Sequence, residues 1–198
     1  MYPVLQRRQA VLQFPPSFFN LGFNEDDELY QSLEQESCVN GFWIAVLSKC
    51  FPPPRHFVQP NSEVKDSSAV DLLVTKFGFR SSGQAIYTPI IVFKGEGVDH
   101  KKDQKKENLT DHIRTCAADT TRKHNLRKIW CIGAKGRSVC FYYFGTTSVS
   151  WTMRPLRVDD DMIVRIGKID DSQAAQYFDL SEFAKINAAF TYIVNDLA

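Results

Sequence analysis

The sequence contains no long hydrophobic segment and no stretch typical of a secretory leader. Its longest apolar runs, Ile44–Leu47 and Ile86–Phe93, are far shorter than the roughly 20 residues that a membrane-spanning helix needs. Within the first thirty residues there is no continuous apolar stretch followed by small residues, as a secretory signal would require. We therefore expect an intracellular protein, cytoplasmic or nuclear, with no membrane partner.

Several motifs of well-known chemistry are also missing. The five cysteines are an odd number without a C-x-x-C pair, and the four histidines have no ligand spacing, so we expect neither a disulfide framework nor a zinc site. No phosphate-binding glycine loop, G-x-S-x-G elbow or kinase signature occurs. Cys116 follows His112 by four residues, but free cysteines are among the most buried residues, so we expect Cys116 in the core.

The composition is that of an ordinary globular protein. The 198 residues are 43% hydrophobic and 24% charged, without repeats or low-complexity linkers, which predicts a single domain over residues 1–198. Residues 1–24 are rich in proline and phenylalanine and are expected to form an irregular N-terminal arm.

The pattern of apolar residues predicts helices and strands in alternating groups. Helices are expected over Glu25–Ser37, within Lys101–His124 and over residues 179–195, where Asp179 and Glu182 form a D-x-x-E start signal. Gly41–Cys50 fits a helix or a strand. The predicted strands are Arg55–Gln59, Ala69–Phe79, Ala85–Lys94, Lys128–Gly133, Ser138–Phe144 and Ser148–Met153, with a hairpin at Ala134–Arg137. This order predicts an α/β fold with a central mixed β-sheet flanked by helices.

Positive charge is concentrated in one segment, although the net charge of the chain is only +1. Between residues 101 and 128 nine basic residues stand against four acidic ones. The basic residues are Lys101, Lys102, Lys105, Lys106, Arg114, Arg122, Lys123, Arg127 and Lys128. Such a segment predicts contact with nucleic acid or another polyanion, and the alternative is a solvated helix face.

Three residues in the middle of the chain could carry phosphodiester chemistry. Asp71 lies at the start of one predicted strand, and Lys94 and Glu96 lie at the end of the next. Metal-assisted hydrolysis needs carboxylates that converge on Mg²⁺ or Mn²⁺, together with a nearby cation. Asp71 and Glu96 are the candidate metal ligands, and Lys94 is the candidate residue for activating water or stabilising charge.

On these residues the segment 55–144 resembles the PD-(D/E)xK nuclease superfamily, including PD-(D/E)xK-like domains of fungal proteins. The resemblance implies a restriction-endonuclease-like sandwich, with an acid on one strand, acid-x-Lys at the end of the next, and then a helix and further strands. Asp71 matches the first acid and Lys94 the lysine. Val70 replaces the usual proline, and Val92 replaces the acid two residues before the lysine.

The missing acid leaves three interpretations open. Glu96 shares a strand face with Val92 and Lys94 and could take over the ligand role, which is the assignment we prefer. Glu107 could do so from the following helix, but its helical phase is opposite to the apolar stripe of that helix. Alternatively, catalysis has been lost and the active site is degenerate.

The sequence thus predicts a divergent nuclease-like protein that acts on or binds nucleic acid. An intact site predicts metal-dependent hydrolysis with Mg²⁺ or Mn²⁺. The alternative is a non-catalytic protein-interaction module, an effector or a regulatory partner, on an inherited nuclease fold.

Overall fold

A computed structural model describes residues 28–60, 70–98, 109–146, 150–168 and 175–197. The N-terminal arm expected over residues 1–24 lies outside these ranges. Within the described ranges no helix combines the length and the hydrophobicity that crossing a bilayer requires.

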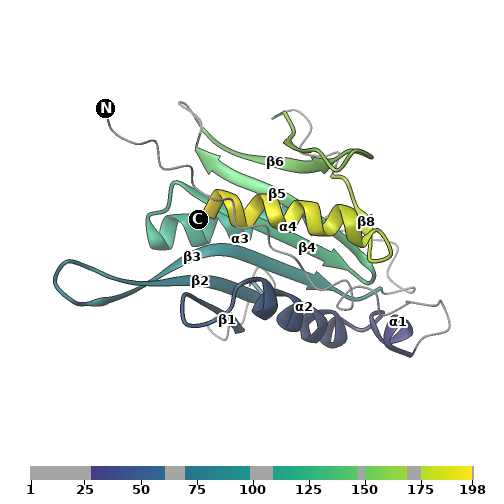
Figure 1. The fold of residues 1–198 in the computed structure, drawn as a ribbon, viewed down its shortest axis with the longest axis horizontal. Coiled ribbons are helices and arrows are strands. Elements are labelled where there is room, and N and C mark those ends of the chain that lie inside the picture. Colours follow the sequence, from purple (N-terminus) through teal and green to yellow (C-terminus); the bar gives the residue numbers. More distant parts are fainter. Residues whose placement is uncertain (1–27, 61–69, 99–108, 147–149, 169–174, 198) are drawn as a thin grey trace, which may run out of the picture.

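The described residues form four helices and an eight-stranded sheet (Figure 1). The helices are α1 (Glu28–Ser32), α2 (Glu36–Cys50), α3 (Leu109–His124) and α4 (Phe183–Leu197). The strands are β1 (His56–Pro60), β2 (Leu72–Phe79), β3 (Ala85–Glu96), β4 (Lys128–Lys135), β5 (Ser138–Thr146), β6 (Trp151–Val158), β7 (Val164–Ile166) and β8 (Phe178–Asp179). The predicted α/β class with a central mixed sheet is confirmed.

The sheet follows the order of the sequence from β1 to β7, and β8 pairs with β5. Neighbouring strands are antiparallel except for β3 and β4, which are parallel and are joined by a crossover that contains α3. A parallel pair needs such a crossover because a tight turn cannot return the chain to the same end of the sheet. The β3–β4 pairing therefore fixes α3 against this part of the sheet.

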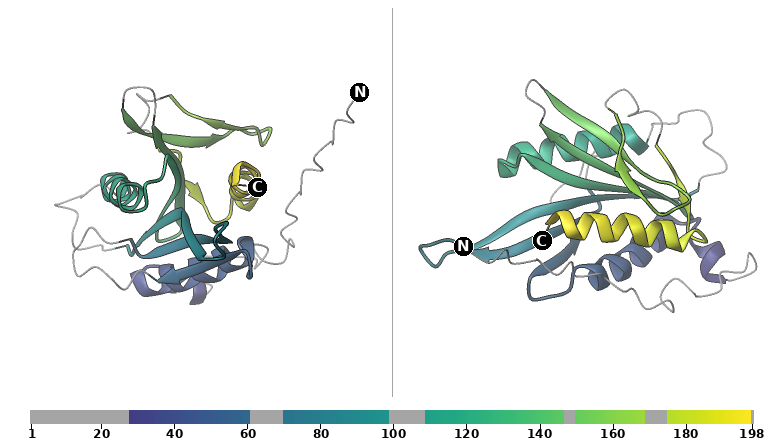
Figure 2. Two further views of the ribbon diagram at one scale, coloured as in Figure 1. Left: turned by 90° about the vertical axis from the view of Figure 1, so that its left-hand side faces the viewer. Right: turned by 45° about the horizontal axis from the view of Figure 1, so that its top comes forward.

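Helices cover both faces of the sheet, and each face has its own hydrophobic cluster. Figure 2 shows α3 on one face and α4 on the opposite face. The larger cluster unites α2, α4 and the sheet around Trp43, Phe93 and Phe190, whose rings lie about 6 Å apart (5.7 Å and 6.2 Å from Trp43). The smaller cluster packs the predicted apolar stripe of α3 against Val92 and Cys131.

The predicted helix over Glu25–Ser37 is wrong in its extent. The structure has the short α1, a turn, and then α2, which continues through the ambiguous segment Gly41–Cys50 as a helix. At this turn the carbonyl of Glu34 accepts the N–H of Val98 at 2.8 Å, a contact that a continuous helix would prevent. Long-range pairing thus overrides the local helix signal.

The remaining predicted elements are close to those observed. Gly136 has the expected positive φ, 55°, in the β4–β5 hairpin. The backbone N–H of Asp179 donates to the Glu182 carboxylate at 3.0 Å, as the D-x-x-E signal predicts. The helix α4 itself begins at Phe183, four residues later than predicted, because Asp179 ends β8. The strand β6 runs further than predicted, through Pro155, whose carbonyl accepts the N–H of Gly167 at 2.7 Å. The short β7 and β8 were not predicted.

Candidate functional site

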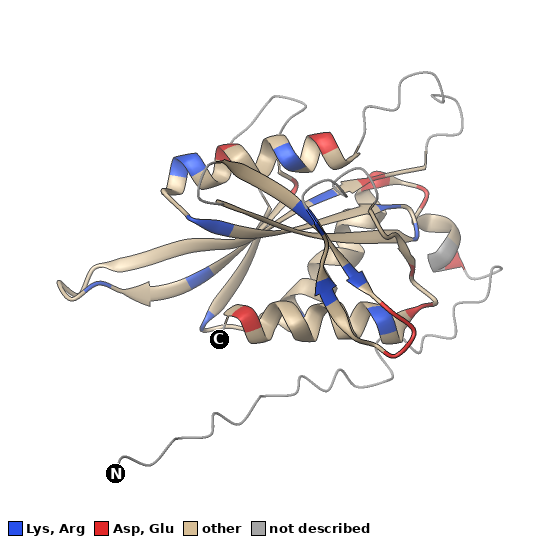
Figure 3. Cartoon of the chain, turned by 90° about the horizontal axis from the view of Figure 1, so that it is seen from above, with Lys and Arg blue, Asp and Glu red and all other residues tan. Residues whose placement is uncertain are grey.

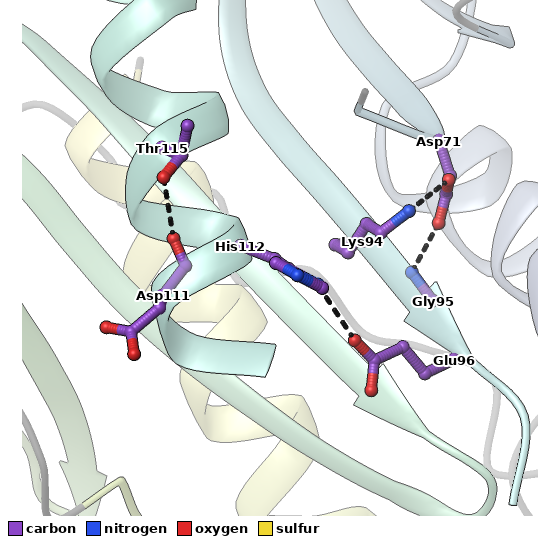
Figure 4. A network of polar contacts seen from close by, with 7 residues as sticks. All are labelled: Asp71, Lys94, Gly95, Glu96, Asp111, His112 and Thr115. Atoms are coloured by element: carbon purple, nitrogen blue, oxygen red, sulfur yellow. Dashed lines mark hydrogen bonds and ion pairs between the residues drawn. The ribbon is translucent and has the colours of Figure 1, made fainter. Parts of the chain in front are cut away.

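Asp71 and Lys94 form an ion pair where β2 begins and β3 ends. The β2–β3 pairing ends at Leu72 and Phe93, and Asp71 lies one residue before β2, where its N–H donates to the Phe93 carbonyl at 3.0 Å. This bond places Asp71 beside Lys94, the residue that follows Phe93. The Lys94 Nζ therefore reaches the Asp71 Oδ1 at 3.0 Å, and only 13% and 14% of the two side chains are exposed (Figure 4).

The second carboxylate oxygen of Asp71 is also occupied. The backbone N–H of Gly95 donates to Oδ2 at 2.7 Å. A side chain at Gly95 is blocked from behind, because an added Cβ would lie 2.2 Å from the Asn40 Oδ1 on α2. The glycine lets α2 pack closely against β3 while its N–H holds the carboxylate.

Glu96 lies on the same face of β3 as Lys94 but turns toward α3. Its Oε1 lies 3.3 Å from the His112 Nδ1, and both side chains are about one quarter exposed (22% and 24%). Figure 4 shows Lys94 directed toward Asp71 and Glu96 directed toward His112. The sequence prediction that Asp71, Lys94 and Glu96 share one region is consistent with this geometry.

Sequence reasoning missed His112 as a partner of Glu96. The available signal was the apolar stripe of α3, because His112 lies one residue before Ile113, which packs against the sheet. That stripe indicated which side of α3 faces the sheet. It did not indicate that β3 would deliver Glu96 to the same position.

Val92, at the position of the missing acid, is a core residue. Its side chain is 1% exposed and packs with Leu109, Ile113 and Cys116 of α3. It supplies no oxygen for a cation, and a carboxylate there would be buried among apolar groups at high cost.

The described residues therefore offer few oxygen ligands for Mg²⁺ or Mn²⁺. Asp71 and Glu96 offer carboxylate oxygens, but the described residues contain no group of three His, Cys, Asp or Glu side chains placed to hold a metal ion. Glu107, the other carboxylate considered, lies outside the described residues. Hard cations require several oxygen ligands, and Asp71 and Glu96 are only two side chains, one of which already binds Lys94 and Gly95.

Cys116 is not an activated nucleophile. Burial raises the pKa of its thiol to about 11, the positive charge of Lys94 lowers it, and the negative charge of Asp71 raises it again. The thiol is therefore protonated at neutral pH, which supports the prediction that Cys116 packs in the core.

A second polar group lies beneath α3, and the sequence did not predict it. The hydroxyl groups of Thr110 and Tyr142 are hydrogen-bonded at 2.8 Å, and the Cys140 thiol donates to the Gly133 carbonyl at 3.5 Å. Burial raises the pKa of Cys140 and of Tyr177 to about 12 each, so both groups are neutral. These hydrogen bonds give partners to polar atoms of Thr110, Tyr142 and Cys140 that are buried beneath α3.

The predicted basic residues divide into two sets. Lys101, Lys102, Lys105 and Lys106 lie outside the described residues. Among the others, Arg114 pairs with Asp111 within α3. The remaining four, which we call the basic end of α3, lie at the C-terminal end of this helix and the start of β4. They are Arg122, Lys123, Arg127 and Lys128, all exposed.

Arg122 and Lys128, in the basic end of α3, each have an acidic partner. Arg122 contacts Asp119 at 3.1 Å, and Lys128 contacts Asp196 of α4 at 2.8 Å. His112 and Arg122 are ten residues apart along α3, which is roughly 15 Å at the rise of an α-helix. The basic end of α3 is thus separate from the Glu96–His112 contact, which lies near the other end of this helix.

Comparison with known proteins gives no match: no protein-family model, no curated protein and no solved structure is significantly similar to this chain.

Proposed function

We propose that the protein binds nucleic acid, as a divergent nuclease-like protein, along the side of the sheet that α3 covers. The observation that carries this proposal is the Asp71–Lys94 pair at 3.0 Å, formed by neighbouring strands and followed by α3 and the parallel β4. This is the order of acid, lysine, helix and further strand that the PD-(D/E)xK resemblance implies.

The basic end of α3 supports the same proposal. Phosphate groups bind where lysine and arginine side chains gather, because each neutralised phosphate releases a counterion. The ion pairs of Arg122 and Lys128 do not prevent this, since exposed ion pairs contribute only about 0–1 kcal/mol. Arg122 is 79% exposed within its pair, so it can exchange Asp119 for a phosphate at little cost.

Salt-dependent binding tests the proposal. We would measure the fluorescence anisotropy of labelled single-stranded and duplex oligonucleotides over a series of salt concentrations. Each phosphate contact contributes about −0.9 for a duplex, or about −0.7 for a single strand, to the slope of log K against log salt. The triple variant Arg122→Ala/Lys123→Ala/Arg127→Ala is expected to reduce the slope by roughly 2–3 and to weaken binding at low salt.

A matched triple variant separates local contact from total charge. Lys49→Ala/Arg165→Ala/Lys168→Ala removes the same charge from exposed positions on α2, on β7 and just after β7. We expect this variant to bind like the wild type. Equal losses in both triple variants, or no binding by the wild type at low salt, would contradict the proposal, and the protein-interaction alternative would then stand.

Metal-dependent hydrolysis stays a prediction and needs its own test. We would compare the melting temperatures of wild type and Asp71→Asn with Mn²⁺ or Mg²⁺ at millimolar concentration, and examine the same samples for cleavage of an oligonucleotide. A cation that binds the folded state alone raises its stability. A shift and cleavage that both disappear in Asp71→Asn would establish a rearranged metal site, whereas neither effect in the wild type would indicate binding without hydrolysis.

A further inference from the structure

A row of aromatic side chains, which we call the aromatic arm, lies on the β2–β3 hairpin and on the neighbouring strand β1. Its members are Phe57 of β1, Phe77 and Phe79 of β2, and Tyr87 of β3. The ring centre of Phe77 lies 4.9 Å from that of Phe79, 5.3 Å from that of Tyr87 and 6.1 Å from that of Phe57. Phe79 is 68% exposed and Tyr87 53%, and the hairpin extends well beyond the rest of the sheet (Figure 1).

The aromatic arm lies on the face of the sheet that α3 covers. Side chains alternate along β2, and Leu73 packs against the α3 cluster, so Thr75, Phe77 and Phe79 follow on the same face. Lys76, between them, points to the opposite face, where its Nζ donates to the Leu197 carbonyl of α4 at 3.2 Å. The aromatic rings and the proposed nucleic-acid surface therefore face the same way.

The aromatic arm and the basic end of α3 also lie at the same end of this face. Because β3 and β4 are parallel with Ile91 facing Trp130, the start of β4 lies level with the part of β3 that follows Tyr87. Lys128 begins β4, and Arg122 and Lys123 end α3 just before it. Figure 3 shows basic residues at this end of α3 and along the hairpin.

The charge of the hairpin complements a polyanion. Residues 72–95 contain no aspartate or glutamate. Of their three cations, Lys76 points to the opposite face and Lys94 is paired with Asp71, so Arg80 is the cation beside the exposed rings. Arg80 lies at the hairpin tip next to Phe79, exposed, with its guanidinium donating to Gln84. Exposed rings beside cations, with no acid among them, are the combination that binds unpaired bases and their phosphates.

We propose that the aromatic arm binds single-stranded nucleic acid, with bases stacked on Phe79 and Tyr87 and phosphates held by Arg80 and the basic end of α3. This inference rests on the proposed function and adds a substrate class to it. Bases in a duplex are stacked on each other and cannot reach the rings, whereas every unpaired base offers an aromatic face. The protein is therefore expected to prefer a single strand to a duplex of the same sequence.

Anisotropy with a labelled single strand and its matched duplex tests this inference in the full-length protein. Stacking on one aromatic ring typically changes affinity by about tenfold or more. We expect Phe79→Ala and Tyr87→Ala each to weaken single-strand binding by about tenfold, with little effect on duplex binding. Phe79→Tyr and Tyr87→Phe keep the rings and are expected to bind like the wild type.

Phe183→Ala is the matched control, since Phe183 is an exposed ring (41%) at the start of α4. It is expected to leave single-strand binding unchanged, and thermal melts would show that all variants fold. Equal affinity for single strand and duplex, or unchanged binding in Phe79→Ala/Tyr87→Ala, would overturn the inference while the proposed function stands. Absence of binding to either oligonucleotide would overturn both.

Discussion

At the scale of single residues, the Asp71–Lys94 pair shows what local sequence can and cannot predict. Both residues were identified because a strand pattern surrounds each of them. Their contact depends on the β2–β3 register, and so does the N–H of Gly95 that holds the other carboxylate oxygen. The partner of Glu96 was not predictable, since His112 reaches it through the packing of α3.

The two members of this ion pair should be energetically coupled. We expect Asp71→Asn and Lys94→Met each to lower the free energy of unfolding by about 1–3 kcal/mol, because each leaves a partly buried polar group without its partner. Urea denaturation of both single variants and the double variant gives the coupling energy, expected at about 1–2 kcal/mol.

The control for this double-mutant cycle is the exposed pair Arg122–Asp119, whose side chains are 79% and 60% accessible. Its coupling should be below about 0.5 kcal/mol, as is usual for exposed helical pairs. Equal coupling in the two cycles would refute the importance of burial for the Asp71–Lys94 pair.

His56 should make stability depend on pH. Its pKa is lowered below the ordinary value of 6.5, first by burial and then by the positive charges of Lys76 and Arg55. The unfolded chain therefore binds this proton more tightly, so the stabilisation is present above about pH 6.5 and is lost as the pH falls below it. The difference in unfolding free energy between about pH 7.5 and pH 5 should be smaller in His56→Gln than in the wild type.

An unchanged pH dependence in His56→Gln would show that His56 titrates alike in both states.

At the scale of helices and strands, the sequence predicted most elements because their signals are local. The apolar stripe of α3, the start signal of α4 and the Gly136 turn each lie within a few residues, and each is present in the structure. The misplaced N-terminal helix and the unpredicted β8 depend on distant partners, Val98 just after β3 and the strand β5, so no short window of sequence contains the deciding interaction. The unpredicted β7 has a near partner, since it returns along β6 after a short turn.

The close approach of α3 to the sheet depends on Gly133. A Cβ at this position of β4 would lie 2.3 Å from the Cδ1 of Ile113 and 3.1 Å from the Sγ of Cys140. We expect Gly133→Ala to lower the free energy of unfolding by about 1–3 kcal/mol, the usual cost of overpacking.

Gly78→Ala is the control in thermal or urea denaturation, because an added Cβ at this position of β2 meets no atom within 4 Å. It should be neutral or stabilise by up to about 1 kcal/mol, since alanine reduces the freedom of the unfolded chain. A Gly133→Ala variant as stable as Gly78→Ala would mean that α3 is free to shift outward.

At the scale of the whole molecule, the two hydrophobic clusters bury four of the five cysteines. Cys50, Cys116, Cys131 and Cys140 are buried, whereas Cys38 is partly exposed. Burial raises the pKa of all four buried thiols. We therefore expect a disulfide reagent at about pH 8 to modify Cys38 quickly and the other four at the rate of unfolding.

The Cys38→Ser variant tests this assignment. The reaction is quenched at successive times, and the number of modified cysteines is measured by mass spectrometry. The fast phase should disappear while the slow phase is retained. A fast phase that persists in Cys38→Ser would show that one of the two clusters opens to the reagent without global unfolding.

The single parallel pairing of the described sheet has a consequence for how the chain folds. On one side of it, β1, β2 and β3 pair with their sequence neighbours, and on the other side β4, β5 and β6 do the same. Contacts between sequence neighbours form early, because the chain loses less entropy in closing short loops. We expect two antiparallel units to form first and to join last at the β3–β4 seam, so that in pulsed hydrogen exchange during refolding the seam amides gain protection after the hairpin amides.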